Sequence, residues 1–344
     1  MKPLAPLVLG VLLVSGCAPA LSVKARRPAE LDLQGARKAA ILGIGGEGGE
    51  AFEQLIHASM RTAGFEVLDR SALEALADAE CVGMTGSLGS PEAAAAIGRA
   101  LGVDLVIAGR AAERYEEKLE NSEFKDAKTN ATKTLYRRGA TARVSVDLGL
   151  HLTGSPAAIP VKLVQWAEEK PIGYVENPPT LDREASMRRA RKATAGAFLR
   201  KVAAYEVVET VHFLKRRSIP ELGQGIALVR GGRLDDAVSA FERAVEGHPS
   251  DTACWFDLGV GYELRGLYDD ADRAYGNAGD LRPAKTPFFR KPFADLERRH
   301  LEDAKRRNAR RLADVRELAR QQAARDEKST APPAAAKTDR LAKS

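Results

Sequence analysis

The chain has 344 residues, of which 44% are hydrophobic and 29% are charged. This composition excludes a fibrous or wholly disordered chain, and the length suffices for two ordinary domains with hydrophobic cores. The net charge of +6 comes from the C-terminal region, because residues 289–344 hold 16 Lys and Arg against 9 Asp and Glu. Three cysteines are too few for a disulfide framework, and we interpret Cys81 and Cys254 as small buried residues.

The first residues have the layout of a secretory signal peptide. Lys2 precedes an apolar run from Leu4 to Val14, which is shorter than the roughly 20 residues of a membrane-spanning helix. The following Val14-Ser15-Gly16-Cys17 resembles the lipobox of bacterial lipoproteins. The resemblance implies removal of residues 1–16, lipid on Cys17 and, with Ala18 beside it, sorting to the outer membrane. We expect a lipid-anchored protein facing the periplasm or the cell surface; an ordinary signal peptide, which would release a soluble protein, is the alternative.

Residues 17–37 are mixed in composition and lack a hydrophobic period, so we predict a tether between the lipid and the first domain. From Lys38 onward, short apolar runs alternate with segments of helical spacing, which predicts an α/β domain. The predicted elements are a strand at 39–44, a helix at 51–63, a strand at 65–68, a helix at 72–79, a Gly/Ser-rich loop at 81–90, a helix at 91–101 and a strand at 103–108.

The second part of this domain has antiparallel character. Residues 115–138 are highly polar and predict an exposed hairpin or loop insertion. The next segment alternates apolar and polar residues, which predicts a strand with one buried face. Its apolar positions are Val144, Val146, Leu148, Leu150 and Leu152. Segments 161–166 and 172–175 are its predicted partners, and 181–217 is predicted as one long amphipathic helix. The predicted fold class of residues 38–217 is α/β, a mixed-sheet sandwich.

Two stretches of this domain resemble a known family. The first is Phe65-Glu66-Val67-Leu68-Asp69-Arg70-Ser71 with Leu73 and Leu76, and the second is Leu101-Gly102-Val103-Asp104-Leu105-Val106-Ile107-Ala108-Gly109. The CsgG-type domain of curli-assembly lipoproteins and the amino-terminal domain of TolB-type proteins have similar strands. The resemblance extends from Lys38 to Val211 and implies an envelope protein. The polar segment 115–138 lacks the apolar alternation of a membrane strand, so the secretion-pore activity of the curli member is not implied.

The second half contains an internal repeat. Residues 218–251 and 252–285 align as two copies of equal length, and their period matches the roughly 34 residues of a tetratricopeptide repeat. The second copy resembles that family at Trp255, Leu258, Gly259, Tyr262, Gly266, Ala271, Tyr275, Ala278 and Pro283. The first copy has its equivalents at Gly225, Leu228, Gly232, Ala237, Phe241, Ala244 and Pro249. We predict an all-α stack of two helical hairpins, capped by neighbouring helices because about three repeats are usually needed for stability.

Tetratricopeptide stacks bind peptides in a concave groove, so this resemblance implies envelope proteins or peptides as partners. The candidate groove residues are Gln224, Leu228, Asp257, Gly261, Glu263 and Arg265. Residues 286–328 predict a charged helix that caps the stack or pairs with a partner helix, and residues 329–344 predict a disordered tail. The densest basic cluster of this helix is Arg306, Arg307, Arg310 and Arg311. Acidic residues interleave with it and aromatic residues are few, so we interpret it as a solvated face and expect no nucleic-acid binding.

One motif suggests a different function. Gly43-Ile44-Gly45-Gly46-Glu47-Gly48 follows a predicted strand and precedes a predicted helix, and Asp69 stands about 20 residues further on, as in a dinucleotide-binding site. The alternative is a glycine-rich turn. Glu47 and Glu50 would repel a pyrophosphate, and a protein outside the cytoplasm has little access to free nicotinamide cofactor. We favour the turn and expect no cofactor.

The remaining residues predict no catalytic chemistry. The histidines show no helical metal-site spacing and stand at His57, His151, His212, His248 and His300. A nucleophile elbow and a cysteine–histidine arrangement are also absent from the sequence. We expect a non-catalytic outer-membrane lipoprotein that serves as a protein-interaction scaffold in envelope assembly or secretion. The alternatives are a regulator of peptidoglycan synthase activity and an exported dinucleotide-binding oxidoreductase; the oligomeric state is left open.

Overall fold

A computed structural model of the chain describes residues 19–69, 91–127, 129–155, 157–170, 173–281 and 291–330. The chain divides into two compact units, each assembled from segments that are far apart in the sequence. The first unit comprises the residues up to Arg26 together with Glu206–Arg316, and the second comprises Arg27–Tyr205 and the residues from Glu317 onward. The predicted fold class is confirmed, because a mixed α/β domain precedes a region of packed helices.

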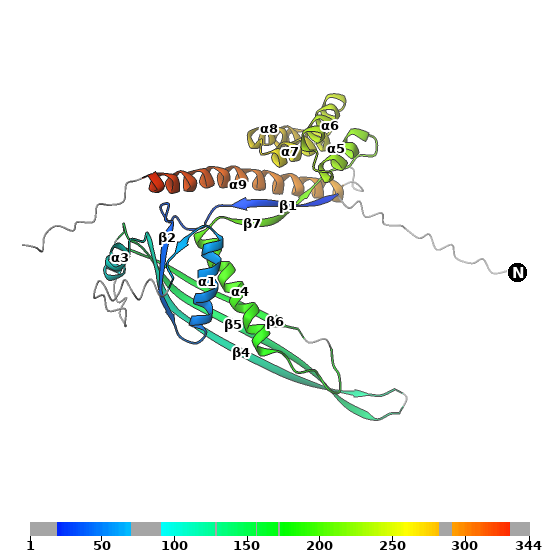
Figure 1. The fold of residues 1–344 in the computed structure, drawn as a ribbon. Coiled ribbons are helices and arrows are strands. Elements are labelled where there is room, and N and C mark those ends of the chain that lie inside the picture. Colours follow the sequence, from blue (N-terminus) through cyan, green and yellow to red (C-terminus); the bar gives the residue numbers. More distant parts are fainter. Residues whose placement is uncertain are drawn as a thin grey trace, which may run out of the picture. The chain divides into compact units, whose positions relative to one another are not determined.

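The second unit contains a five-stranded sheet in the order β3-β2-β4-β5-β6. Its strands are β2 (Lys38–Gly45), β3 (Glu66–Val67), β4 (Leu105–Lys125), β5 (Thr132–Leu152) and β6 (Ala158–Glu169). Strand β2 runs parallel to β3 and β4, whereas β4, β5 and β6 pair in antiparallel fashion. The polar insertion is the outer part of the long β4–β5 hairpin, which extends beyond the rest of the sheet (Figure 1). The hairpin interpretation of this segment is therefore confirmed.

Helices α1 (Gly49–Thr62) and α4 (Arg183–Val202) lie side by side along one face of this sheet (Figure 1). Phe52 of α1 and Phe198 of α4 are fully buried, in one core with the inward side chains of β2, β4 and β5. All five predicted apolar positions of the alternating strand belong to this core. The sequence predicts β5 correctly because a period of two places one set of side chains on a single face.

The opposite face of the sheet is covered at one end by α3 (Pro91–Ala100). Ala94 of this helix and Val106 of β4 form a small second cluster with Ala40 and Val103. The polar side of β5 therefore also meets protein at this end, and His151 is buried there although the alternation assigns it to the outer face. Burial lowers the pKa of His151, because the charged imidazolium loses its hydration.

The first unit contains a two-stranded sheet of β1 (Ala20–Arg27) and β7 (Tyr205–His212). Its helices are α5 (Pro220–Arg230), α6 (Leu234–Gly247), α7 (Thr252–Arg265) and α8 (Tyr268–Asp280). Helix α5 packs against α6, α6 against α7, and α7 against α8, as expected for two consecutive hairpins. The apolar side chains of these helices form one core with residues from β1 and β7.

The two hairpins share one packing contact, which recurs at equivalent positions of the two sequence copies. A Cβ atom added to Gly225 would collide with the ring of Phe241, and a Cβ atom added to Gly259 would collide with the ring of Tyr275. Both glycines lie on the first helix of their hairpin, and both rings are fully buried on the second helix. The glycines thus let a large ring approach the backbone of the neighbouring helix, which closes each hairpin.

Helix α9 (Lys291–Thr330) confirms the predicted charged helix, and its residues belong to both units. Residues 291–316 are part of the first unit, whereas residues 317–330 are part of the second. In the second unit, Arg320 forms an ion pair with Asp32 at 3.0 Å. The side-chain amide of Gln321 donates to the carbonyl oxygen of Ala29 and accepts from its backbone N–H, both at 3.1 Å. The α/β unit is therefore completed by the C-terminal segment of the chain.

Two predictions about the organisation of the chain are wrong. The proposed tether at 17–37 contains strand β1, and the proposed helix at 181–217 ends with α4 at Val202, after which β7 begins. Residues 205–212 alternate half-buried and exposed positions and are rich in Val and Thr, which favour strands. Val208, which a helix over 181–217 would place on its apolar face, is 70% exposed. The pairing of β1 with β7 orders both segments.

Several sequence predictions lie outside the described residues. These are the signal peptide with Cys17, Cys81, the helix at 72–79, the loop at 81–90 and the tail beyond Thr330. They stay predictions.

Candidate functional site

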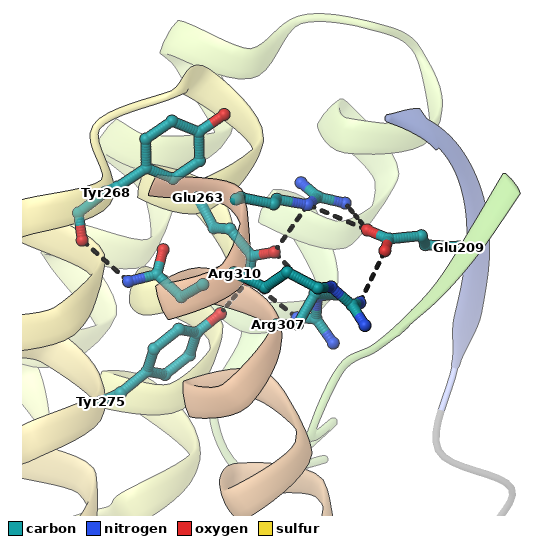
Figure 2. Close-up of polar contacts among 8 residues, drawn as sticks. Glu209, Glu263, Tyr268, Tyr275, Arg307 and Arg310 are labelled. Carbon is teal, nitrogen blue, oxygen red and sulfur yellow. Dashed lines mark hydrogen bonds and ion pairs between the residues drawn. The ribbon is translucent and has the colours of Figure 1, made fainter. Parts of the chain in front are cut away.

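The inner helix of the second hairpin contacts the C-terminal helix of the same unit through buried charges. Glu263 of α7 accepts hydrogen bonds from Nε and Nη2 of Arg307 on α9, at 2.7 and 2.8 Å. The hydroxyl of Tyr275 donates to the same carboxylate at 2.8 Å (Figure 2). Glu263 and Arg307 are both buried, so this pair is shielded from water.

A second carboxylate continues the cluster. Glu209 of β7 accepts from Nε and Nη2 of Arg311 at 3.0 and 2.9 Å, and from Nη2 of Arg310 at 2.7 Å (Figure 2). Arg311 also lies 3.2 Å from Glu263 and so links the two carboxylates. We call Glu209, Glu263, Arg307, Arg310 and Arg311 the arginine cluster. It joins β7, α7 and the first part of α9.

Burial and charge act together on the ionisable groups here. Burial alone would lower the pKa of Arg307, but its hydrogen bonds and charge interaction with Glu263 raise it above the ordinary value. Burial raises the pKa of Tyr275 well above its usual range, and the neighbouring charge of Glu263 acts in the same direction. Both groups therefore keep their protons across the physiological pH range. Removing one member of such a buried network leaves its partner uncompensated, which is strongly destabilising.

Asp257 occupies a second buried polar position on α7. Its Oδ1 accepts the backbone N–H of Leu214, just after β7, at 2.8 Å. Its Oδ2 is buried and has no hydrogen-bond partner among the described residues. Burial raises the pKa of Asp257 well above its ordinary value, which the hydrogen bond from Leu214 and the charge of Arg216 only partly oppose. The protonated form of this carboxyl is therefore favoured in the folded unit.

The structure separates the six candidate groove residues into two groups. Asp257, Gly261 and Glu263 are buried, and the two carboxyl groups bond to other segments of the unit. A partner cannot reach them directly, so the interpretation of these three as contact residues is wrong. Asp257 is covered by the segment after β7, Glu263 by α9, and Gly261 faces Phe241 and Val238 of α6.

The other three candidates remain accessible. Gln224 on α5 is exposed, and Leu228 one turn later is half-buried against the core of the unit. Arg265 is exposed and forms an ion pair with Asp235 at 2.6 Å. The accessible candidates therefore lie on α5 and at the C-terminal end of α7.

The basic cluster of α9 is also divided. Arg306 and Arg310 are exposed, as a solvated face predicts, but Arg307 and Arg311 are each only 8% exposed. The solvated interpretation is therefore wrong for the last two. Hydrophobic periodicity counts apolar residues and cannot identify an arginine that is buried against a carboxylate.

A cavity of about 380 Å³ lies beside the arginine cluster. Its lining comes from β7, α7 and α9 and consists of Glu209, Thr210, His212, Phe256, His300, Asp303, Arg306, Arg307 and Arg310. The imidazole rings of His212 and His300 lie 4.3 Å apart between centroids, with their planes 31° apart. The sequence does not reveal this pair, because the two histidines are far apart in the chain and are brought together only by the fold.

The glycine-rich turn after β2 does not resemble a phosphate-binding loop. Gly46 has a φ of 92°, and a Cβ atom there would collide with the backbone of Ala111 on β4. A Cβ atom on Gly48 would collide with the side chain of Glu113. The backbone N–H of Ile44 donates to the carboxylate of Glu53 at 3.1 Å. These glycines allow close packing against β4, beside carboxylates that repel a pyrophosphate.

Other chemistry can be assessed only for the part of the chain that the structure describes. Within it, no group of His, Cys, Asp and Glu side chains is suited to hold a metal ion. Helices long and apolar enough to cross a membrane are likewise not found in those ranges. Cys254 is a buried free thiol, as predicted, and burial raises its pKa to about 12. Its thiolate is therefore not available at physiological pH.

Comparison with known proteins gives only distant structural similarities. No protein-family model matches the chain, and no curated protein matches it. The chain is similar to the LpoB C-terminal domain from Salmonella enterica, with 12% identity, a TM-score of 0.25, and coverage of 38% of this chain and 82% of that domain. It is also similar to PelC, solved as a dodecamer from Paraburkholderia phytofirmans, with 12% identity and a TM-score of 0.24. That match covers 53% of this chain and 96% of the PelC chain. Similarities at this level assign neither a family nor a function.

Proposed function

We propose that this chain is a non-catalytic envelope lipoprotein, anchored in the outer membrane through Cys17, that acts as a protein-interaction scaffold. The observation that carries the proposal is the repeated hairpin, in which the contact of Gly225 with Phe241 recurs in the second copy as Gly259 against Tyr275. This arrangement supports a tetratricopeptide-type stack, whose helices present surfaces to peptides. The α/β unit is then a CsgG- or TolB-type domain, as the two strand motifs suggest.

The accessible surface of the first hairpin is the part of the stack that best suits a partner. The corresponding part of α7 is covered by the segment after β7 and by α9. Helix α5 instead presents exposed Gln224 and Arg230, with half-buried Leu228 between them. We therefore place the contact with envelope proteins on α5.

The oxidoreductase alternative receives no support from the residues around the glycine-rich turn. The cavity beside helix α1 is lined by Glu50, Glu53 and Asp69, together with Gln54 and His57. Glu50 and Glu53 in the first turns of α1, together with Asp69 after β3, oppose the negative charge of a dinucleotide. We therefore do not retain that alternative.

The test is an affinity pull-down from crosslinked envelopes with mass spectrometry of the proteins that co-purify. Deleting residues 218–344 would also remove the segment of α9 that belongs to the α/β unit. Point variants of the full chain are therefore better. Gln224→Ala with Leu228→Ala changes α5, and Arg243→Ala with Glu246→Ala changes exposed positions of α6 as the matched control.

Partners lost from the α5 variant but kept by the α6 control would support the scaffold and identify its pathway. A penicillin-binding protein among them would assign the scaffold to peptidoglycan synthesis. Wild-type protein that captures no envelope protein would contradict the proposal. A Cys17→Ser variant that still fractionates with the outer membrane would contradict the proposed anchor.

A further inference from the structure

The proposed contact surface on α5 does not include the cavity beside the arginine cluster. Its lining includes three arginines against two carboxylates, a balance of 3 − 2 = +1 before either histidine is protonated. With both histidines protonated the balance becomes +3. The three arginines all come from α9, and basic side chains that line one cavity favour an anionic ligand.

The two histidines add donors that can respond to a ligand. Nδ1 of His212 is buried and has no hydrogen-bond partner among the described residues. Burial, reinforced by the proximity of His212, lowers the pKa of His300, so its ring is neutral near pH 7. A bound anion would favour protonation of the His300 ring. The neutral imidazole of His300, beside the ring of His212, is therefore able to gain charge when an anion enters the cavity.

The arginine cluster indicates which anion fits best. Arg307 and Arg311 each hold a carboxylate through Nε and Nη2, with all four distances between 2.7 and 3.0 Å. The planar guanidinium group matches the two oxygens of a carboxylate. Arg306 and Arg310 present the same group at the cavity and are exposed. A cavity of about 380 Å³ lies at the small end of ligand sites, which suits one side chain or chain terminus.

We propose that this cavity binds a carboxylate of an acidic peptide segment, held by Arg306 and Arg310 and by the paired rings of His212 and His300. The inference rests on the proposed function, because it states the chemistry of the partner that the scaffold recognises. It adds a second contact site to the surface of α5. Glu209 and Asp303 also line the cavity, and their charges oppose a carboxylate that approaches from their side.

Binding by this site depends on pH. The charged groups that act on the histidines are Glu209 from β7 and, from α9, Arg299, Asp303, Arg306, Arg307 and Arg310, whereas α7 contributes the uncharged Phe256. A bound carboxylate raises the pKa of His300, so the complex takes up a proton that the free protein lacks. Affinity therefore increases as the pH falls through the pKa of His300, and it is greater at about pH 6 than at about pH 8.

The experiment is a fluorescence-anisotropy titration of the full chain with labelled hexaglutamate at low salt. Arg306→Gln removes a donor that lines the cavity and whose only ion pair in the described structure is with Asp303. Arg298→Gln is the matched control, because Arg298 is on the same helix, has the same i, i+3 pairing with Asp295 and does not line the cavity. His300→Gln removes one titrating ring.

The expected result is a dissociation constant that is about tenfold higher for Arg306→Gln, as loss of one charge-assisted hydrogen bond predicts, and nearly unchanged for Arg298→Gln. His300→Gln should flatten the dependence on pH. Equal weakening by both arginine variants would show general attraction to a basic helix and overturn the site. Displacement of the peptide by inorganic phosphate but not by acetate would overturn the choice of a carboxylate.

A flat titration with wild-type protein would also overturn the cavity site, whatever the pull-down shows. Partners captured through α5 without hexaglutamate binding would leave the scaffold standing and remove only this inference. Hexaglutamate binding without any captured partner would support the cavity site and contradict the scaffold. The two experiments therefore fail independently.

Discussion

The two parts of helix α9 use the same kind of side chain in different surroundings. In residues 291–316, Arg307 meets Glu263 with the side chains 9% and 0% exposed. In residues 317–330, Arg320 meets Asp32 at a similar distance, but the side chains are 53% and 50% exposed. The second pair is exposed to screening by water, whereas the first pair is buried away from it. The burial of an ion pair, more than its length, therefore decides how much stability the protein loses when the pair is broken.

The chain is well suited to test this comparison, because its two tryptophans lie in different units. Trp255 is on α7 in the first unit, and Trp166 is on β6 in the second. Trp166→Phe therefore leaves a fluorescence reporter of the first unit, and Trp255→Phe leaves one of the second. Each variant below is measured by denaturant unfolding in the appropriate background.

The largest effect is expected for Glu263→Ala. The substitution leaves Arg307 and Arg311 without the carboxylate that they share, and should lower the free energy of unfolding of the first unit by about 3–5 kcal/mol. Trp255 fluorescence reports the transition. The double substitution Glu263→Met with Arg307→Met should recover most of the loss, since apolar pairs can replace buried ion pairs. A loss below about 1 kcal/mol for Glu263→Ala would refute the comparison.

The buried carboxyl of Asp257 sharpens the comparison by showing a buried acid without a cationic hydrogen-bond partner. Asp257→Ala removes the acceptor for the Leu214 N–H and should cost about 1–3 kcal/mol. Asp257→Asn keeps an acceptor oxygen and should be tolerated. Trp255 fluorescence measures both variants.

The sign of its pH dependence follows from the raised pKa of Asp257. Above the ordinary value of 3.8, the unfolded chain releases a proton that the folded unit retains. The stabilisation is thus complete at low pH and is lost as the pH rises through the folded-state pKa. The difference in unfolding free energy between wild type and Asp257→Asn should therefore decrease with rising pH. A constant difference would show that Asp257 is ionised in the folded unit.

At the repeated glycine, we expect a loss of stability that comes from steric collision and involves no charged group. Gly259→Ala forces a methyl group against the ring of Tyr275, and should cost about 1–3 kcal/mol. Gly276→Ala on α8 is the matched control, because no atom lies within 4 Å of the added Cβ. Helix propensity predicts that this control is more stable by about 0.5–1 kcal/mol. Similar behaviour of both variants would remove the argument for close helix approach.

The smallest effect is expected for Arg320→Ala in the exposed part of α9. Loss of its pairs with Asp32 and Glu317 should lower the stability of the second unit by less than about 1 kcal/mol. Trp166 fluorescence measures this change, and added salt should reduce it further because the pair is exposed. A loss as large as that of Glu263→Ala would show that burial does not separate the two parts of the helix.

The sequence predicted those elements whose own residues carry a pattern. Strand β5 alternates its apolar residues, and the two hairpins follow the internal repeat, so both are confirmed. The strand at 205–212 was missed because Tyr205 and Val208 also fit a helical stripe. Its partner β1, at residues 20–27, is far from residues 205–212 in the sequence. No local pattern records a pairing of that kind.

The site residues were harder to predict for a related reason. The choice of Asp257 and Glu263 identified the right helix, but not the segments that cover it. Arg307 and Asn308 are buried, and they share a helix face with buried Ala304. The spacing of these three residues is helical, yet two of them are polar, so an apolar stripe does not include them. Their complementary groups lie on α7 and α8, 40 or more residues away.

The discontinuous composition of the two units has a consequence for how the chain acquires its structure. The first unit joins residues near position 20 to residues beyond 206, and the second joins residue 27 onward to residues beyond 317. Neither can be completed while α9 is still inside the ribosome. Contacts between such distant segments slow folding, since a long loop must close before they form. The nascent chain therefore stays incompletely folded until its C-terminal helix emerges, the interval in which a chaperone would protect it from aggregation.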